Sequence, residues 1–370
     1  MASPLLFSPL KLRGLELPNR IVVSPMAQYS AADGIATDWH LMHMGALAVS
    51  GVGLFISEAT SIEPEARVSP YCLGLWSDEH ENALARIVAF CRQHGDTRMG
   101  IQLMHSGRKG SVGAPWQGQK EVAEANGGWQ TWSCSEVPYA GRSAPRAMTR
   151  DDLTAVRQRY VDAARRAERI GFDLLEIHNA HGYLLHSFLS PLSNARSDEY
   201  GGSLENRMRF PLEVFRSIRD AWPQDKPIGV RISATDWTPG GWTLDESVVF
   251  ARELKALGCD YITASSGGSS DSQTIPVGPG YQLPLAERIR REAGIHTMGV
   301  GLITEPEQAE AALQEGKADL LALGRAMMYQ PRWAWHAAER LGCDAFFPPQ
   351  YARSHPSMRS KNFLKATRDA

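Results

Sequence analysis

Residues 172–179 read FDLLEIHN, and they follow a segment at residues 151–170 whose apolar side chains recur at helical spacing. The short apolar run is typical of a buried strand, and a strand next to a helix is the unit from which parallel sheets are built. Thr149 supplies an N-cap hydroxyl for this helix, and Gly171 stands where a left-handed residue usually ends one. This stretch therefore predicts an α/β fold.

The same alternation recurs on both sides of residues 172–179. Short apolar runs predict seven further strands, at residues 21–26, 53–59, 99–105, 228–233, 259–266, 297–301 and 318–324. Helical spacing predicts helices between several of them, at residues 78–94, 244–257 and 305–314. Eight is the strand number of the α/β barrel, so we expect a single (β/α)8 TIM barrel.

Two connections are too long to be simple turns. Residues 106–149 are rich in Gly and Trp, and residues 180–207 contain the sequence DEYGGS. Both follow the carboxyl end of a predicted strand, where barrels carry their binding loops. No linker composition or low-complexity tract divides the chain, so we expect residues 1–370 to form one domain with insertions.

Charge and composition exclude several classes of protein. The chain has 39 Lys and Arg against 41 Asp and Glu, a net charge of -2, so no basic field gathers nucleic acid or an anionic membrane. Its five cysteines form no CxxC pair, which favours a reducing compartment. The first residues show no positively charged start followed by a sustained apolar run, and no run of about 18 apolar residues occurs, so we expect neither a signal peptide nor a membrane span. We predict a cytoplasmic protein without nucleic-acid or membrane partners.

The carboxyl ends of the predicted strands are polar. If the barrel closes, these ends face a common mouth. The polar and glycine positions at or near them are Ser24, Gln28, Tyr29, Glu58, Thr60, Gln102, His105, His178, His181, Tyr183, Arg231, Ser233, Ser265, Ser266, Gly267, Gly268, Gly299, Gly301, Gly324 and Arg325. A mouth lined in this way predicts a binding or catalytic site.

Glycines and an arginine follow the last two predicted strands. Barrels commonly hold phosphate at this place, because glycines let backbone N–H groups approach the oxygens. Arg325 would add a fixed positive charge beside Gly324, while Gly301 stands at the preceding strand end. Alternatively, both glycines only let the chain turn and Arg325 is a surface charge, but their position in the eightfold pattern favours phosphate.

His178 and His181 end the fourth predicted strand, with Tyr183 two residues further on. A histidine pair at this spacing can bind a metal, act as a base, or donate to a substrate oxygen. A metal needs a third ligand, for which only Glu58 or Glu176 could be nominated, so we predict no metal. We expect paired donors to one carbonyl oxygen, with Tyr183 as a proton donor rather than a core aromatic.

Gln102 and Arg231 interrupt otherwise apolar strands. A buried amide or guanidinium needs hydrogen-bond partners. A planar heterocycle with carbonyl and imide groups would supply them, although a structural salt bridge explains Arg231 equally well. The cofactor class is therefore left open by these two residues alone.

Long motifs resemble one known family. They include LPNRIVVSPM from residue 17, IQLMHSGRKG from residue 101, the segment from Glu176 to Arg207 that begins EIHNAHGYLLHSF, ADLLALGRA from residue 318 and PQYARSHP from residue 349. These stretches are similar to those of the old yellow enzymes, FMN-dependent ene-reductases that are built as a single barrel. Within that family the chain resembles the bacterial thermophilic-like subgroup, which includes xenobiotic reductases.

The resemblance implies a role for particular residues. His178 and His181 would bind the substrate oxygen, Tyr183 would donate the proton, and Tyr29 would contact the ligand. Arg353 would reach into the active site of a neighbouring subunit, which implies a homodimer or homotetramer with residues 340–370 at the interface. The residues implied in FMN binding are Ser24, Pro25, Met26, Ala27, Ala59, Gln102, Arg231, Gly301, Gly324 and Arg325.

One position departs from the subgroup. Its members usually carry cysteine where this chain has Ala27, near the reactive edge of the flavin. Alanine is smaller and offers neither a weak S–H donor nor a thiolate. We therefore expect altered rates of flavin reduction and reoxidation and a roomier pocket.

The resemblance also implies a reaction. NADPH or NADH would reduce FMN, which would pass hydride from N5 to the β-carbon of an α,β-unsaturated carbonyl or nitro compound, and Tyr183 would protonate the α-carbon. The alternatives are a barrel lyase or isomerase that acts on a phosphorylated substrate, and a flavin-binding protein without ene-reductase turnover. Trp116, Trp129 and Trp132 form a lid in the loop at residues 106–149 or merely pack it.

Overall fold

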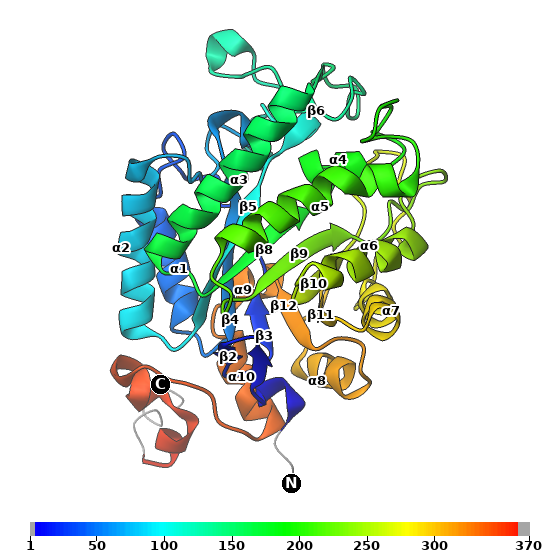
Figure 1. Cartoon of the computed structure of the whole chain (residues 1–370). Coiled ribbons are helices and arrows are strands. Elements are labelled where there is room, and N and C mark those ends of the chain that lie inside the picture. The colour runs from blue at the N-terminus through cyan, green and yellow to red at the C-terminus, as the bar shows by residue number, and fades with distance from the viewer. Residues whose placement is uncertain (1–3, 362–370) are drawn as a thin grey trace.

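A closed barrel of eight parallel strands forms the centre of the molecule in a computed structural model that describes residues 4–361 (Figure 1). Around the barrel the order is β10, β11, β12, β3, β4, β5, β8 and β9. Their bounds are β3 (Ile21–Val23), β4 (Leu54–Ser61), β5 (Arg98–Met104), β8 (Leu174–Asn179), β9 (Ile228–Ser233), β10 (Tyr261–Ser265), β11 (His296–Gly299) and β12 (Leu320–Leu323). The predicted TIM barrel is confirmed, since each barrel strand overlaps one predicted run.

Helices connect these strands and surround the barrel (Figure 1). They are α1 (Asp38–Ala48), α2 (Asp78–His94), α3 (Arg150–Ile170), α4 (Leu184–Leu189), α5 (Leu204–Ala221), α6 (Leu244–Ala256), α7 (Leu283–Ala293), α8 (Pro306–Gln314), α9 (Arg325–Tyr329) and α10 (Trp333–Leu341). The predicted helices agree with α2, α3, α6 and α8 to within one residue at each end. Thr149 caps α3 by accepting from the backbone N–H of Asp152, and Gly171 ends it at φ 95°.

The sequence pattern did not mark α4, which lies inside the predicted connection at residues 180–207, or α5, which begins at the end of that connection. All six residues of α4 are buried, so that helix has no polar face to give a period. Pro211 lies inside α5, where its ring interrupts the usual helix signature. The true loop after β8 and α4 is therefore shorter than the sequence suggested.

Strand alternation separates two cores. Val22 of β3 points into the barrel, while its neighbours Ile21 and Val23 pack outward against the helices. The hairpin of β1 (Leu10–Leu12) and β2 (Leu15–Leu17) adds Leu12 and Leu17 to the interior cluster. The barrel interior below the carboxyl ends of the strands is thus packed with side chains. The space for a site therefore lies at the carboxyl ends themselves.

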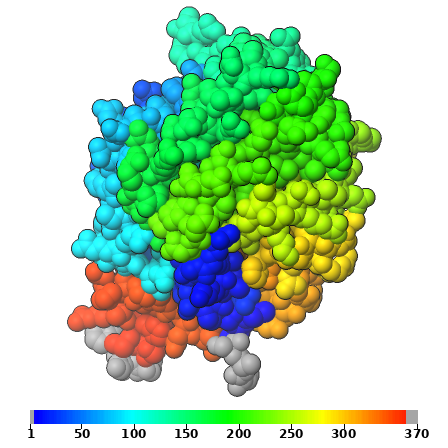
Figure 2. All heavy atoms as spheres, in the orientation of Figure 1, coloured from blue at the N-terminus to red at the C-terminus, as the bar shows by residue number. Residues whose placement is uncertain are grey.

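The connection between β5 and α3 forms the projection at the top of the molecule (Figure 2). It contains the two short strands β6 (Trp132–Ser133) and β7 (Arg146–Ala147), which pair with each other. At the other end of the molecule, the C-terminal segment lies beside α1 and α2, where Pro348, Gln350 and Tyr351 help to line a surface groove. No described helix is long and apolar enough to cross a membrane.

Candidate active site

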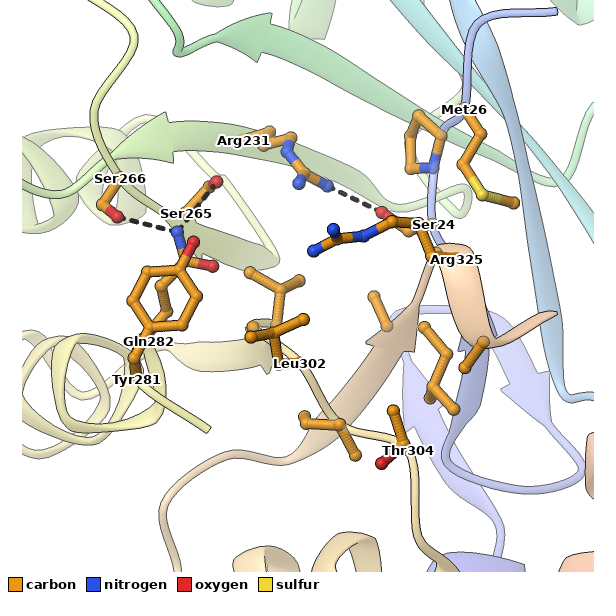
Figure 3. A pocket seen from close by; sticks show the side chains of 18 of the residues that line it. Ser24, Met26, Arg231, Ser265, Ser266, Tyr281, Gln282, Leu302, Thr304 and Arg325 are labelled. Carbon is orange, nitrogen blue, oxygen red and sulfur yellow. Dashed lines mark hydrogen bonds between the residues drawn. The ribbon is translucent and has the colours of Figure 1, made fainter. Parts of the chain in front are cut away.

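A cavity of about 320 Å³ opens at the carboxyl ends of β9 to β12 and β3 (Figure 3). This volume is within the range of roughly 300–1,000 Å³ that is usual for small-molecule sites. The residues around it are Ser24, Pro25, Met26, His181, Arg231, Ser265, Ser266, Tyr281, Gln282, Val300, Gly301, Leu302, Ile303, Thr304, Ala322, Leu323, Gly324, Arg325, Ala326 and Met328. The cavity thus includes seven of the ten residues implied in FMN binding.

Two arginines give this cavity its charge. The guanidinium groups of Arg231 and Arg325 point into it from β9 and from the start of α9 (Figure 3). Nη1 of Arg231 donates to Ser24 Oγ at 3.0 Å, whereas its buried Nε has no partner among the described residues. Because no carboxylate lines the cavity, it is suited to an anionic ligand with planar or forked acceptors.

Backbone shape supports a phosphate at one end of the cavity. Gly301 has φ +112°, which side chains rarely adopt, and an added Cβ would lie 3.2 Å from Gln282. Gly324 precedes α9, whose first N–H groups have no acceptor within the helix. These features fit the phosphate of FMN, and Arg231 offers its unpartnered N–H to the polar edge of the flavin ring.

Tyr281 and Gln282 were not predicted as site residues. They lie before α7, and Gln282 Nε2 donates to Ser266 Oγ at 2.7 Å and to Ser265 Oγ at 3.4 Å. The connection from β10 to α7 is long and rich in Gly, Ser and Pro, and it follows a barrel strand as the two predicted binding loops do. Its length is the signal that could have identified these two residues.

The two predicted histidines are brought together at the top of β8. His178 Nε2 lies 3.3 Å from His181 Nδ1, and His181 Nε2 lies 2.7 Å from Ser265 Oγ. His178 Nδ1 accepts from the backbone N–H of Ala180 at 3.2 Å, so the neutral ring carries its proton on Nε2. This N–H points to His181 Nδ1, so Nδ1 is the acceptor. The single proton of the neutral His181 ring is therefore on Nε2, facing Ser265.

Both imidazoles are neutral near pH 7. Burial is the main cause that lowers the pKa of His178 and of His181 well below the ordinary value, and the charge of Arg231 acts in the same direction. Neutral rings donate hydrogen bonds without placing a fixed charge beside the cavity. The pair therefore suits an oxygen that gains negative charge during a reaction.

Another buried histidine, His186, supports the turn at His181 and Gly182. His181 and Gly182 have positive φ angles of 59° and 73°, and His186 Nδ1 accepts from the backbone N–H of Gly182 at 2.8 Å. His186 Nε2 lies 3.1 Å from Asp236 Oδ1, and both side chains are fully buried. Asp236–His186 is thus a buried dyad that holds a strained backbone turn, and sequence reasoning missed it.

The Asp236 carboxylate is well supplied with donors. Burial opposes its ionisation, but the neighbouring His186, with hydrogen bonds from Ser190 and Trp242, lowers the pKa of Asp236 below its ordinary value. Ser190 Oγ donates to Oδ2 at 2.5 Å, and the backbone N–H of Trp242 donates to the same oxygen at 2.8 Å. The ionised carboxylate can therefore only accept, which fixes the proton of His186 on Nε2.

Tyr183 lies against the histidine pair. Its ring centroid is 4.9 Å from that of His178, with the two rings almost perpendicular. Tyr29 and Ala59, which the resemblance also implicates, pack with Tyr183 against one small apolar cluster. Burial raises the pKa of the Tyr183 phenol, so it keeps its proton near neutral pH.

Gln102 faces the barrel interior and does not line the cavity. The strand register pairs it with Glu176, and Gln102 Nε2 donates to Glu176 Oε1 at 2.7 Å. Thr263 Oγ1 donates to the other carboxylate oxygen at 2.5 Å. Because Glu176 takes the amide N–H, the carbonyl oxygen of Gln102 is turned away from that carboxylate.

Three other predicted residues do not line this cavity. Ala27 is exposed, and Ala59 is separated from the cavity lining by its place in the apolar cluster with Tyr183. Arg353 is exposed in a 3-10 helix (Pro349–Ser354) on the C-terminal segment. Residues 362–370, the end of the predicted interface segment, lie outside the described residues.

Neither carboxylate considered as a third metal ligand approaches the histidine pair as a partner. Glu58 Oε1 lies 3.2 Å from His40 Nε2, and its Oε2 accepts from the backbone N–H of Gln28. Glu176 is engaged by Gln102 and Thr263. Among the described residues, no group of three His, Cys, Asp or Glu side chains is placed to hold a metal ion.

The tryptophans of the β5–α3 connection divide into two kinds. Trp129 donates to the carbonyl of Glu65 at 3.1 Å, and Trp132 packs under the guanidinium of Arg146. Trp116 is 70% exposed and meets the edge of Tyr29, with 5.8 Å between ring centroids. Trp129 and Trp132 therefore pack the loop, whereas Trp116 is largely exposed beside Tyr29.

The fold and the cavity together define a barrel enzyme with a site for a phosphate-bearing cofactor. A model of the NADH:flavin oxidoreductase / NADH oxidase family matches residues 5–343. The chain belongs to this family, that of the old yellow enzymes.

Relatives of known name agree over almost the whole chain. The NADPH dehydrogenase of Geobacillus thermodenitrificans (strain NG80-2) is 45% identical over 351 residues, which cover 94% of this chain and 98% of that protein. The NADPH dehydrogenase of Listeria innocua serovar 6a is 43% identical over 356 residues, with the same coverage. The chain is therefore an FMN-dependent oxidoreductase with NAD(P)H as its reductant.

Solved structures share the fold at lower identity. Morphinone reductase superposes with a TM-score of 0.77 at 29% identity, covering 94% of this chain and 93% of that one. The old yellow enzyme homologue from Zymomonas mobilis gives a TM-score of 0.76 at 26% identity, covering 95% and 99%. These matches argue against a barrel lyase or isomerase, the first alternative left open by the sequence.

Proposed function

We propose that this protein reduces the activated C=C bond of α,β-unsaturated carbonyl or nitro compounds. The observation that carries the proposal is the contact of Tyr183 with the His178/His181 pair, beside a cavity suited to FMN. Two neutral N–H donors and a protonated phenol are the groups needed to receive developing negative charge and to supply a proton.

The chain's residues would hold FMN in a defined way. Arg325, Gly301 and Gly324 would bind the phosphate, and Arg231 with Ser24 would bind the flavin ring. Bound FMN supplies the hydride chemistry, accepting from the dihydronicotinamide and donating to the β-carbon of the alkene. The protein's own contribution is to bind, orient and protonate the substrate.

The histidine pair binds the substrate oxygen through a change of tautomer. His178 Nε2 already carries a proton, but without a ligand this N–H donates its hydrogen bond to His181 Nδ1. When a carbonyl or nitro oxygen replaces this contact, His181 adopts its other neutral tautomer: it loses the proton from Nε2, gains one at Nδ1, and Nε2 then accepts a hydrogen bond from the Ser265 hydroxyl. Two N–H groups then face one oxygen and stabilise the charge that develops on it.

Tyr183 delivers the proton to the α-carbon. Its raised pKa keeps the phenol protonated until negative charge develops beside it. A positioned general acid contributes roughly 100- to 10,000-fold to a rate. The addition is complete when the hydride and this proton have reached neighbouring carbons.

We also propose that the working form is a homodimer or homotetramer in a reducing cytoplasm. Arg353 is exposed and remote from the cavity of its own chain, which leaves it available to a neighbouring subunit. All five cysteines are free thiols. Sedimentation of the wild-type protein and of Arg353→Ala, together with their enone kinetics, tests the oligomer and the residue separately.

An anaerobic absorbance titration tests the reaction. NADPH is added to the FMN-loaded protein until the visible flavin band is bleached, and 2-cyclohexenone is then added. Recovery of the band is expected, with cyclohexanone as the product. A bleached band that the enone does not restore would reject ene-reductase turnover, leaving a flavin reductase.

A further inference from the structure

Three cations surround one aromatic ring in the connection between β5 and α3. Lys109 Nζ lies 4.3 Å from the ring centroid of Tyr139, and the guanidinium carbons of Arg142 and Arg108 lie at 5.3 and 5.7 Å. We name Arg108, Lys109, Arg142 and Tyr139 the Tyr139 cluster. Cations at these distances are attracted to the ring face but are not neutralised by it.

The cluster has no counter-charge within ion-pair distance among the described residues. Lys109 donates to the carbonyls of His181 and Gly268, each at 2.8 Å, and Arg142 donates through Nη1 to the carbonyl of Lys109 at 2.9 Å. The nearby carboxylate of Glu121 binds Ser143 instead. Carbonyl dipoles satisfy hydrogen bonds, yet the cluster keeps its net charge.

Arg146 of the same connection shows the usual alternative. Its guanidinium lies 4.6 Å from the Trp132 ring centroid and also binds the carboxylate of Asp152 at 2.7 and 3.1 Å. Arg142 and Arg146 thus each contact an aromatic ring, Tyr139 and Trp132 respectively, but they differ in whether a carboxylate also binds them. Asp152 neutralises the charge of Arg146, whereas the charge of Arg142 has no carboxylate partner among the described residues.

The charged form of Lys109 is disfavoured in its surroundings. Burial, together with the charges of Arg142 and Arg108, lowers the pKa of Lys109 to about 7. A bound anion would favour the charged ammonium and relieve this repulsion. Four of the five guanidinium N–H groups of Arg142 have no acceptor among the described residues.

The cluster lies on the reactive side of the site. Lys109 Nζ is 5.4 Å from the ring centroid of Tyr183 and binds the carbonyl of His181, which itself lines the cavity. None of the three cations lines that cavity, whose own charges are Arg231 and Arg325. The mouth therefore has two separate cationic regions, and FMN brings phosphate to only one.

We propose that Lys109 and Arg142 bind the pyrophosphate of NAD(P)H while its nicotinamide ring occupies the site beside Tyr183. The inference rests on the proposed function, because it requires the reductant to enter where the alkene later binds. Arg108 is almost fully buried and holds the carbonyls of Pro138 and Ser269, so it would fix the loop. The pyrophosphate is common to NADH and NADPH.

Comparison of two reductants tests this proposal. NADPH carries the pyrophosphate, whereas 1-benzyl-1,4-dihydronicotinamide carries the same reactive ring and no phosphate. In Arg142→Gln, the apparent Kd for NADPH in anaerobic stopped-flow flavin reduction should rise roughly tenfold or more, because a charge-assisted contact is lost. Reduction by the benzyl compound should change less than about twofold.

Arg146→Gln is the matched control, since it removes the same charge from the same connection. Its Kd for NADPH should stay within about twofold of wild type. If Arg142→Gln weakens both reductants equally, the cluster only fastens the loop and the proposal fails. It also fails if NADPH binding is unchanged in Arg142→Gln.

A measurement on the wild-type protein needs no variant. Inorganic pyrophosphate should compete with NADPH for flavin reduction and leave the benzyl compound unaffected at the same ionic strength. Inhibition of neither reductant, or of both, overturns the proposal. The proposed ene-reductase function has its own readout, since reoxidation of dithionite-reduced flavin by 2-cyclohexenone involves no pyrophosphate.

Discussion

The segment from β8 through α4 and the connection between β5 and α3 meet at the same active site, yet they are held in different ways. In the first, His178, His181 and His186 are fixed by carboxylate, hydroxyl and backbone partners whose direction sets each proton. In the second, cations contact carbonyls and ring faces. Directional hydrogen bonds fix the groups that react. Cations that contact carbonyls and ring faces can adjust to a ligand that binds and is then released.

The largest expected effect comes from removing the phenol at the end of the first segment. Tyr183→Phe keeps the ring against His178 and removes the proton donor. Flavin reoxidation by 2-cyclohexenone should slow by roughly 100- to 10,000-fold, the usual contribution of a general acid. Stopped-flow absorbance of the NADPH-reduced protein measures this step directly.

Flavin reduction by NADPH is the internal control for Tyr183→Phe. That half-reaction transfers hydride without a proton from the phenol, so its rate should stay within a few-fold of wild type. Equal loss in both half-reactions would show that the ring positions ligands and does not donate the proton.

Breaking the buried dyad tests whether directional bonds control the active-site turn. Asp236→Asn keeps the shape but places an amide N–H against either His186 or the backbone N–H of Trp242. One buried donor then faces another, which costs about 1–3 kcal/mol. The unfolding free energy should fall by this amount, and enone-dependent reoxidation should slow roughly tenfold as the Gly182 turn shifts.

Ser190→Ala is the matched control for Asp236→Asn. It removes a hydrogen bond to the same carboxylate without reversing the proton of His186. It should lower the unfolding free energy and leave reoxidation within about twofold. If both variants slow reoxidation equally, the dyad contributes only stability and does not position the histidine pair.

The sequence predicts the barrel and much of the site for a local reason. Barrel strands are short apolar runs, and their carboxyl ends converge whatever the helices between them do. The register then pairs His178 with Arg231, as the predicted common mouth requires. Apolar periodicity therefore finds Arg231, His178 and Tyr183 without any knowledge of their partners.

What the sequence could not predict depends on contacts between distant segments. The partner of His186 is Asp236, which is 50 residues away by their numbers and follows another strand. Lys109 is an ordinary cation in the sequence, and only the fold brings its ammonium to the carbonyls of His181 and Gly268. Helix α4, entirely buried, carries no period for a pattern to detect.

A smaller effect tests the tautomer of His181. Ser265→Ala removes the hydroxyl that can donate a hydrogen bond to His181 Nε2, so the tautomer with the proton on Nδ1 is less favoured. The loss of one hydrogen bond of about 0.5–1.5 kcal/mol should weaken enone binding roughly two- to tenfold. Ser266→Ala also loses a contact with Gln282 but none with His181, so enone binding should be unchanged. Equal effects in both variants would contradict this role of Ser265.

An effect no larger than that of Ser265→Ala is expected at the tip of the β5–α3 connection. Trp116 is largely exposed and contacts Tyr29 through one ring edge, so Trp116→Ala removes cover from the ligand without opening the core. An aromatic pair contributes about 0.5–1.5 kcal/mol, which corresponds to a two- to tenfold rise in KM for bulky enones with kcat retained. Trp132→Ala, by contrast, removes packing under Arg146 and should lower the unfolding free energy. A kcat loss in Trp116→Ala would show that this loop helps to position the reacting atoms, and the contrast between the two regions would fail.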